Sequence, residues 1–184
     1  AAPSYADFDE LVAAAMAAPR PLVVVLDGIE DPHNLGALIR TANGAGAQGV
    51  IIPQRRAVGL TGTVEKSSAG AVAYTPVARV TNLVRAIEAL KDAGFWVVGA
   101  EADGKHLPYE VDMTGPIALV VGSEGAGMGR LVSETCDYVV RLPLLGQVPS
   151  LNASVAGGVL MYEIVRQRVT QDPSLVPPPV PKQD

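Results

Sequence analysis

PIALVVGSEGAGMGRLV, residues 116–132, is the stretch of sequence from which the fold class follows most directly. An apolar run predicts a strand over Ile117–Gly122, and a helix is expected over Met128–Glu134. Four glycines, at positions 122, 125, 127 and 129, fill the connection between them. Glycines let a backbone approach a flat or charged ligand closely, although a plain structural turn explains them about as often. The stretch therefore predicts an α/β unit whose loop is a candidate ligand site.

The same alternation of strand and helix continues on both sides of this stretch. The other predicted strands are Leu22–Leu26, Gly49–Pro53, Phe95–Ala100 and Tyr138–Leu142. The other predicted helices are Leu35–Gly46, Thr61–Ser68, Asn82–Ala93 and Ala153–Arg168. Such alternation requires crossover connections, so it predicts an α/β fold with a mostly parallel sheet flanked by helices. Ligands bind beyond the carboxyl ends of parallel strands, which directs attention to the loops that begin at Asp27, Glu101, Ser123 and Pro143.

Composition sets the broad class of the protein. The 184 residues suffice for one domain, and 48% apolar with only 4% aromatic residues predicts a core of aliphatic side chains. A single cysteine, Cys136, excludes an intrachain disulfide and is expected to be a small buried residue rather than a nucleophile. No apolar run approaches the ~20 residues of a membrane span. The N-terminus lacks a basic region followed by an apolar core, so we expect no signal peptide and a cytoplasmic location.

The two ends are expected to lie outside a central domain of residues 21–168. Asp7–Ala18 predicts an amphipathic helix within an arm of residues 1–20, whereas the proline-rich residues 169–184 predict a disordered tail. The formal net charge of −5 argues against extensive nucleic-acid contact, although it does not exclude a local basic patch. The candidates for a basic rim near the loops are Arg55, Arg56, Lys66, Arg79 and Arg130.

DGIEDPHNLGALIRTANGAG, residues 27–46, combines a polar loop with a helix start. Asn34 is expected to cap this helix. Arg40 lies opposite the apolar stripe of the helix, with Gly36 and Gly44 one turn before and after it. These glycines leave room for a ligand or a second subunit to approach the backbone, whereas wheel geometry alone favours an ordinary solvated arginine.

RLPLLGQVPSLNASVAGGVLMYEIVRQR, residues 141–168, places Gly146, Ser150 and Asn152 between a strand and a helix of small residues. The helix is apolar around most of its circumference, so it is either a central core helix or one that also packs in a subunit interface. His33, beside Asn34, is expected to be a loop or capping residue. No cluster of Cys, His, Asp and Glu with metal-ligand spacing accompanies it, so no metal is expected.

A Rossmann dinucleotide site is the alternative explanation of the glycine loop. The spacing disfavours it, because counting from Gly125 places the last glycine of G-x-G-x-x-G on Arg130. The next strand along the chain, which ends near Leu142, also lacks an acidic residue that could hold a ribose. A nucleotide-dependent oxidoreductase is therefore the weaker hypothesis.

Taken in this order, the three segments resemble the three sequence motifs of the SpoU, or TrmH-type, branch of the SPOUT methyltransferases. The matching residues are Asn34–Arg40 (NLGALIR), Gly122–Gly127 (GSEGAG) and Ser150–Asn152 (SLN). One motif alone is weak evidence, whereas three with suitable separations are strong. The resemblance runs from about Pro21 to Arg168. The intervening segments are most similar to the branch that methylates a guanosine of 23S ribosomal RNA, and transfer-RNA ribose methyltransferases are close relatives.

The resemblance implies a C-terminal trefoil knot, a homodimer, S-adenosylmethionine as cofactor and RNA as partner. Cofactor contacts are implied at the matching positions Gly122, Gly125, Leu142, Gly146, Leu151 and Asn152. The catalytic set is implied to be Asn34, Arg40, Glu124, Ser150 and Asn152. Relatives also carry a small N-terminal RNA-binding domain ahead of a linker that Asp7–Ala18 resembles, and this sequence lacks that domain.

Three functions follow as hypotheses. The first is an RNA (guanosine-2′-O-)methyltransferase, most similar to those acting on ribosomal RNA, with a transfer-RNA guanosine as the alternative target. The second is a non-catalytic RNA-binding module of the same fold, and the third is the oxidoreductase. The presence of Arg40, Glu124, Ser150 and Asn152 favours the enzyme.

Overall fold

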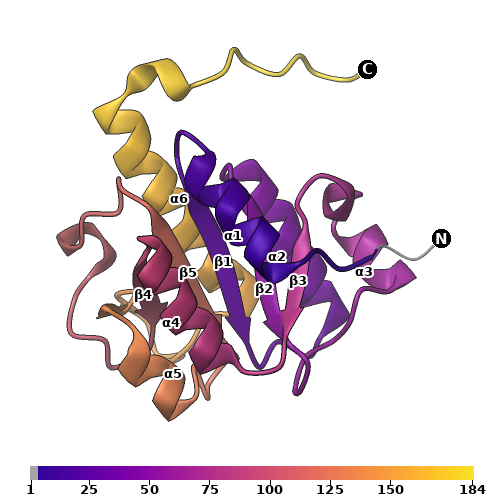
Figure 1. Cartoon of the computed structure of the whole chain (residues 1–184). Coiled ribbons are helices and arrows are strands. Elements are labelled where there is room, and N and C mark those ends of the chain that lie inside the picture. Colours follow the sequence, from indigo (N-terminus) through magenta and orange to yellow (C-terminus); the bar gives the residue numbers. More distant parts are fainter. Residues whose placement is uncertain (1–3) are drawn as a thin grey trace.

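The computed structural model describes residues 4–184, and six parallel strands form one sheet there (Figure 1). The strands are β1 (Leu22–Asp27), β2 (Gly49–Pro53), β3 (Val77–Val80), β4 (Trp96–Ala100), β5 (Ile117–Gly122) and β6 (Tyr138–Val140). Their spatial order is β3-β2-β1-β5-β4-β6. The two central strands pair along their full length, from Leu22 with Ile117 to Asp27 with Gly122. The predicted α/β fold with a parallel sheet is confirmed.

Helices cover both faces of this sheet. They are α1 (Phe8–Ala17), α2 (Pro32–Gly44), α3 (Gly62–Ser67), α4 (Leu83–Ala93), α5 (Arg130–Thr135) and α6 (Ala153–Gln171). Side chains of successive strand residues point to opposite faces and so build two cores. Val24 and Leu119 pack with α2 and α6, whereas Val25 and Val120 pack with α1, α4 and α5. All four of these side chains are fully buried.

Strand β3 is absent from the predicted elements. Its four residues, Val77–Val80, lie at the edge of the sheet, where they pair with β2 and receive an isolated bridge from Ala6. Val77 and Ala78 are buried, but the exposed Arg79 interrupts the apolar run. A run this short carries too little periodicity to distinguish a strand from a loop.

The start of α2 corrects one predicted role. The helix begins at Pro32, and the carboxylate of Asp31 caps it by accepting a hydrogen bond from the amide of His33 (2.8 Å). Proline suits the first turn of a helix because its missing N–H would be unpaired there. Asn34 therefore lies inside the first turn, and the prediction that it caps the helix is wrong.

Both ends of the chain continue into regular structure. Within the predicted arm, Asp7 caps α1, and Leu11, Val12 and Ala15 are buried. Residues 1–3 of that arm lie outside the described residues. At the other end α6 extends to Gln171, and a short 3-10 helix, η3 (Pro173–Leu175), follows it. Across residues 4–184, no helix combines the length and the apolar character needed to cross a membrane.

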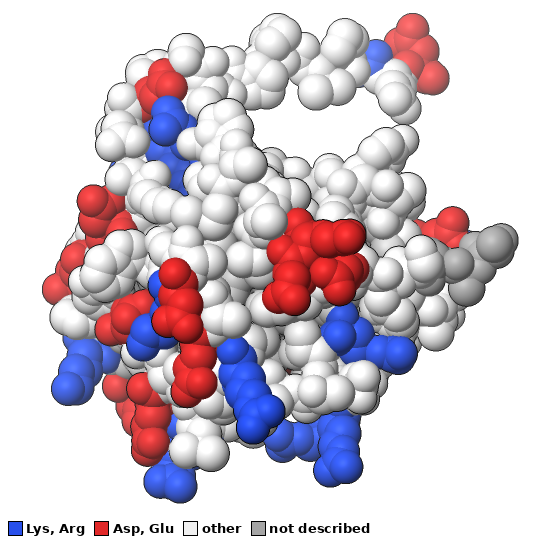
Figure 2. All heavy atoms as spheres, viewed as in Figure 1, with Lys and Arg blue, Asp and Glu red and all other residues white. Residues whose placement is uncertain are grey.

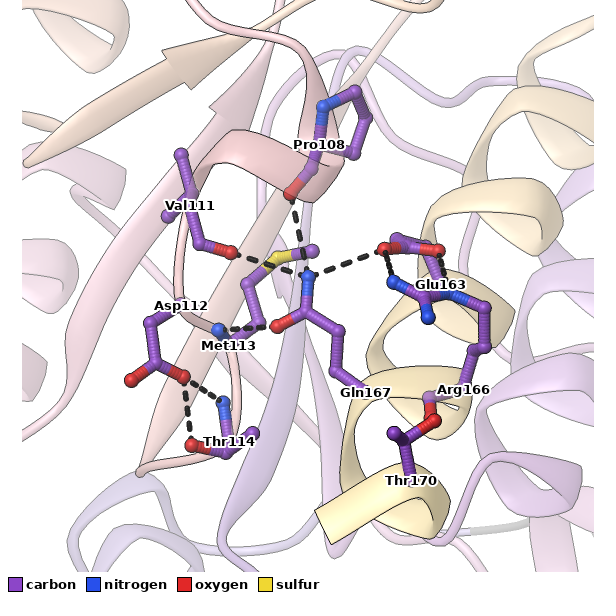
Figure 3. Close-up of polar contacts among 9 residues, drawn as sticks. All are labelled: Pro108, Val111, Asp112, Met113, Thr114, Glu163, Arg166, Gln167 and Thr170. Atoms are coloured by element: carbon purple, nitrogen blue, oxygen red, sulfur yellow. Dashed lines mark hydrogen bonds and ion pairs between the residues drawn. The ribbon is translucent and has the colours of Figure 1, made fainter.

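The last helix is attached to residues 101–116, the connection between β4 and β5 (Figure 3). The side-chain oxygen of Gln167 accepts a hydrogen bond from the amide of Met113 (2.7 Å). Its side-chain nitrogen donates to the carbonyls of Val111 (3.1 Å) and Pro108 (3.4 Å), the latter in the short 3-10 helix η2 (Pro108–Glu110). This attachment fits a C-terminal segment threaded past the β4–β5 connection, and the trefoil knot itself stays a prediction of the family resemblance.

Arg168, the next residue, ties α6 to the same connection and to the residues that precede β1. Its guanidinium donates to the carbonyls of Met113 (3.4 Å), Gly115 (2.9 Å), Pro21 (2.8 Å) and Arg20 (3.3 Å). The residue is only 4% exposed, and this burial, with the charge of Arg20, lowers the pKa of Arg168 to about 10. The side chain thus stays charged at neutral pH. In residues 4–184 no carboxylate pairs with it, so carbonyl oxygens alone compensate the buried charge.

Arg168→Met should lower the free energy of unfolding by about 3 kcal/mol, because buried carbonyl groups lose a charged donor. Arg166→Met is the matched control: Arg166 is exposed and pairs only with Glu163 (2.7 Å), so little or no loss is expected. Urea unfolding followed by circular dichroism measures both variants. Equal losses would contradict a special role for the buried guanidinium.

Candidate active site

A cavity of about 150 Å³ opens at the carboxyl ends of β4, β5 and β6, against the start of α6. Its apolar wall is formed by Val121, Val140, Leu142, Leu144, Leu151 and Leu160. Its polar side chains are Glu101, Ser123, Glu124 and Ser150, and no lysine or arginine of the described residues lines it. Such a wall suits a ligand that has a flat apolar part and a few polar groups.

The glycine loop after β5 folds back on itself. The amide of Gly127 donates to the carbonyl of Ser123 (2.8 Å), and the amide of Ser123 donates to the carbonyl of Gly127 (3.2 Å). A side chain at Gly122 would overlap the backbone of Gly127, which itself has a φ of 67°. These glycines are needed by the turn itself. Gly125 (φ 78°) differs, because it lines the cavity and a Cβ there would meet open space.

Two carboxylates hold the end of this loop. Asp27, the last residue of β1, accepts a hydrogen bond from the amide of Gly129 (2.7 Å). Glu101, the first residue after β4, accepts one from the amide of Met128 (3.2 Å). Helix α5 begins at Arg130 instead of the predicted Met128, because the backbone of Gly129 is extended (ψ 152°).

Glu101 is the cavity residue that sequence reasoning did not assign. Burial raises the pKa of its carboxyl, the hydrogen bond from Met128 opposes this, and the charges of Asp103 and Asp27 add to the rise. Chain order directs attention to the next strand along the chain, which ends near Leu142 and has no acidic residue at its end. In space β5 lies beside β4, so the relevant strand end is the one that precedes Glu101.

The first and third motifs meet at the start of α6. The side-chain amide of Asn152 donates to the side-chain oxygen of Asn34 (3.2 Å). The oxygen of Asn152 also caps α6, because it accepts from the amides of Ser154 (3.0 Å) and Val155 (3.2 Å). Asn152 therefore has a structural role as well as a place beside the cavity.

The remaining predicted contacts divide into two groups. Gly122, Gly125, Leu142, Leu151, Glu124 and Ser150 all line the cavity. Gly146 and Asn152 do not line it, and Gly146 lies on an exposed stretch of the β6–α6 connection. The structure thus brings most of the predicted set together around one cavity.

Arg40 lies apart from this cavity. It is exposed on α2, six residues beyond Asn34, which corresponds to about 9 Å along a helix axis. Within residues 4–184 its side chain makes no hydrogen bond or ion pair. A single copy of the chain therefore leaves its guanidinium available to another molecule.

The glycines beside Arg40 correct a further prediction. A side chain at Gly36 would overlap Ser67 of α3, and one at Gly44 would approach the hydroxyl of Tyr162 of α6 to 2.9 Å. Both positions are therefore small because helices of the same chain pack against them. They do not provide the open space for a ligand that the sequence suggested.

Helix α6 buries one side and exposes another. Gly157 allows Leu38 of α2 to pack closely, and Leu160, Met161 and Ile164 are buried. Val155, Val159 and Tyr162, spaced as one helical stripe, are 52%, 48% and 51% exposed. The helix thus has a core face and an uncovered apolar face, which we call the α6 stripe.

Two further groups of side chains were considered for chemistry: the thiol of Cys136, which is partly buried, and the possible metal ligands. Burial, assisted mainly by the charge of Asp137, raises the pKa of the Cys136 thiol to about 12, which makes it a poor nucleophile. The side chain donates instead to the carbonyl of Val132 (3.3 Å). Over residues 4–184, no three His, Cys, Asp or Glu side chains gather in a way that could hold a metal ion.

Basic side chains gather along the lower edge in Figure 2, the edge to which β1 and β2 point in Figure 1, whereas acidic side chains cluster over the start of α1. Arg55 and Arg56 follow β2 directly, and both are exposed. Arg79 stacks on Tyr5 (4.2 Å to the ring centre), and Arg130 pairs with Glu134 (3.5 Å). The acidic net charge therefore coexists with basic groups at the edge where the strands end.

Comparisons with known proteins agree with this architecture. Residues 21–162 match the model of the SpoU rRNA Methylase family. The chain is 54% identical over 169 residues to YacO of Bacillus subtilis (strain 168), which carries the name of a TrmH family tRNA/rRNA methyltransferase. This match covers 91% of the chain and 68% of YacO, so the chain spans about two thirds of that relative.

Solved structures give the same result. The SpoU methyltransferase AviRb from Streptomyces viridochromogenes superposes with a TM-score of 0.79 at 31% identity, covering 91% of this chain and 66% of that one. An AdoMet-bound rRNA methyltransferase from Sinorhizobium meliloti also gives a TM-score of 0.79, at 29% identity, covering 89% of this chain and 61% of that one. With the family model matching most of its length and a relative at 54% identity, the chain belongs to the SpoU rRNA methylase family.

Proposed function

We propose that this chain is the catalytic domain of an RNA ribose 2′-O-methyltransferase that transfers a methyl group from S-adenosylmethionine to a guanosine of 23S ribosomal RNA. The observation that carries the proposal is the convergence of the three family motifs. Glu124 and Ser150 line one cavity, and the bond between Asn34 and Asn152 joins the other two motif positions beside it. The cytoplasm is the proposed location.

The cavity fits S-adenosylmethionine by its chemistry. Leu142, Leu151 and Leu160 offer an apolar wall for an adenine ring, and the open face of Gly125 lets a ligand reach the backbone. The relative from Sinorhizobium meliloti was solved with AdoMet bound. We assign the cofactor contacts to Gly122, Gly125, Leu142 and Leu151, with Gly146 and Asn152 as outer members.

When bound, the cofactor supplies an electrophilic methyl carbon: a ribose oxygen attacks it, the carbon–sulfur bond breaks, and the hydroxyl proton is lost. Arg40 is the residue we assign to the attacking oxygen. A guanidinium normally carries a positive charge. Arg40 therefore binds a phosphate or the 2′-oxygen and stabilises the negative charge that develops on that oxygen. Water or a phosphate accepts the proton. The alternative, in which Arg40 is itself the base, requires a neutral guanidinium.

A homodimer completes this proposed site. Within one chain Arg40 lies about two helical turns from the cavity-side Asn34. The α6 stripe lies on a neighbouring helix, because Tyr162 approaches Gly44 of α2. An isologous interface over the α6 stripe would cover this apolar surface and bring the Arg40 of one subunit toward the cavity of the other.

Arg40→Ala should abolish methyl transfer while leaving S-adenosylmethionine binding within about twofold, because Arg40 does not line the cavity. Arg40→Lys should keep partial activity, since it retains a charge but loses the forked geometry. Single-turnover transfer and binding calorimetry measure the two effects, with Arg85→Ala, an exposed arginine of α4, as control. Near-full activity of Arg40→Ala would refute the assignment and direct attention to His33.

The chain should be a dimer at micromolar concentration, and Val159→Asp should convert it to a monomer, because a buried unpaired charge is costly in an apolar interface. Light scattering gives the mass of each protein. A monomeric mass for the unchanged chain would contradict the proposed interface.

This chain alone should bind the cofactor but methylate protein-free ribosomal RNA poorly. Its net charge is −5, and it spans about two thirds of its relative YacO. Labelled methyl transfer to ribosomal and transfer RNA in parallel, followed by mapping of the modified nucleotide, measures activity and target together. Full activity on ribosomal RNA would show that this chain suffices, whereas a mapped transfer-RNA guanosine would replace the proposed substrate.

The competing function is a non-catalytic RNA-binding module of the same fold. A module that has lost its cofactor should give no heat on titration with S-adenosylmethionine. Absence of heat, together with absence of methyl transfer to any RNA, would favour the module over the enzyme.

A further inference from the structure

Glu101 stands beside the turning point of the glycine loop. Strand β4 pairs with β5 up to Gly99 with Val120, so continuing the register places Glu101 level with Gly122. Asp27 occupies the same level on the other side of β5, where it pairs with Gly122. The loop thus leaves the sheet between two carboxylates that come from the neighbouring strands.

The two carboxylates are used differently. Asp27 accepts a hydrogen bond from the amide of Gly129. It is only 7% exposed and does not line the cavity. Glu101 lines the cavity, and only its Oε1 is engaged, by the amide of Met128. Its Oε2 lies over Gly127, close enough that any side chain there would overlap it. No donor of residues 4–184 bonds to this second oxygen.

This second oxygen is available to accept a hydrogen bond from a ligand in the cavity. Among residues 4–184, no lysine or arginine lines the cavity, so these residues supply no cation for it. A carboxylate that follows a strand beside the glycine-loop strand occupies the position from which parallel-sheet proteins hold the ribose of a nucleotide. If the leucines of the cavity pack against the adenine ring, the hydroxyl-bearing ribose is left for the polar side chains.

We propose that Glu101 is a ribose-binding residue: its Oε2 accepts a hydrogen bond from a ribose hydroxyl of the cofactor while its Oε1 holds the loop through Met128. The assignment rests on the proposed cofactor. It gives Glu101 a role separate from that of Asp27, which positions the loop without touching the ligand.

The test compares ligands that differ by one hydroxyl. S-adenosylhomocysteine and its 2′-deoxy and 3′-deoxy ribose analogues are titrated calorimetrically into the full chain. For the unchanged protein, one deoxy analogue should bind about 10- to 100-fold more weakly, as expected for a hydrogen bond to a charged group. In Glu101→Ala the affinity for S-adenosylhomocysteine should fall by a similar factor. The difference in affinity between S-adenosylhomocysteine and that deoxy analogue should then vanish.

Two variants separate ribose contact from loop support. Asp27→Asn should weaken all three ligands by the same factor, because it acts only through Gly129. Glu88→Gln, on an exposed face of α4, should leave every affinity unchanged. Circular dichroism confirms that each variant is folded, and Glu101→Met, which keeps the length of the side chain but has no oxygen acceptor, replaces Glu101→Ala if the latter is not.

The outcomes are distinguishable. A hydroxyl preference that persists in the Glu101 variant overturns the assignment, as does an unchanged protein that binds all three ligands equally. A third outcome would assign the carboxylate to the sulfonium of S-adenosylmethionine instead. In that case the unchanged protein prefers S-adenosylmethionine to S-adenosylhomocysteine, and the Glu101 variant binds the two equally but still distinguishes the deoxy analogue. Absence of heat with any ligand would instead refute the proposed cofactor.

Discussion

The parallel pairing of β1 with β5 is the constraint on which the rest of the molecule depends. These strands are distant in sequence, yet they run in register over their full length and end together at Asp27 and Gly122. Because parallel strands end at the same edge, this pairing brings the first motif, which follows β1, to the second, which follows β5. It also puts the Asp27 carboxylate within 2.7 Å of the amide of Gly129. The loop shape is thus a consequence of the sheet.

The third motif reaches the same edge by a different route. Strand β6 lies at the far side of the sheet, and the chain must return across the strand ends before α6 can pack on α2 and β5. Asn152 ends this return by capping α6 and bonding to Asn34. Gln167 and Arg168 secure the other end of the helix to the β4–β5 connection and to the start of β1. Helix α6 is therefore anchored at both ends, and its start fixes the C-terminal end of residues 142–151, which contribute to the cavity wall.

Periodicity sufficed for the fold class because five of the six strands are apolar runs separated by helical patterns. It failed where tertiary contacts decide the structure. The four residues of β3 are a strand only because β2 offers them an edge, and α2 begins at Pro32 because Asp31 caps it. Gly36 and Gly44 are small for helix packing, which a single helical wheel cannot reveal.

The candidate site was predictable where the family motifs name residues, and unpredictable where sheet order matters. Glu124, Ser150 and Leu151 were placed at the cavity by their motifs alone. Glu101 required the knowledge that β4, not β6, lies beside β5, and chain order gives no such information. Arg40 shows the opposite problem, because its place in the motif is clear while the structure leaves it away from the cavity, a distance that the proposed homodimer would account for.

The most direct test of the account is a map of where S-adenosylhomocysteine binds, from backbone amide shifts of the isotope-labelled chain during titration. The account predicts saturable changes confined to the strand-end edge, centred on Gly122, Gly125, Leu142 and Leu151, with the amides around Gln167 unaffected. Changes centred elsewhere on the molecule, or none at saturating ligand, would contradict it.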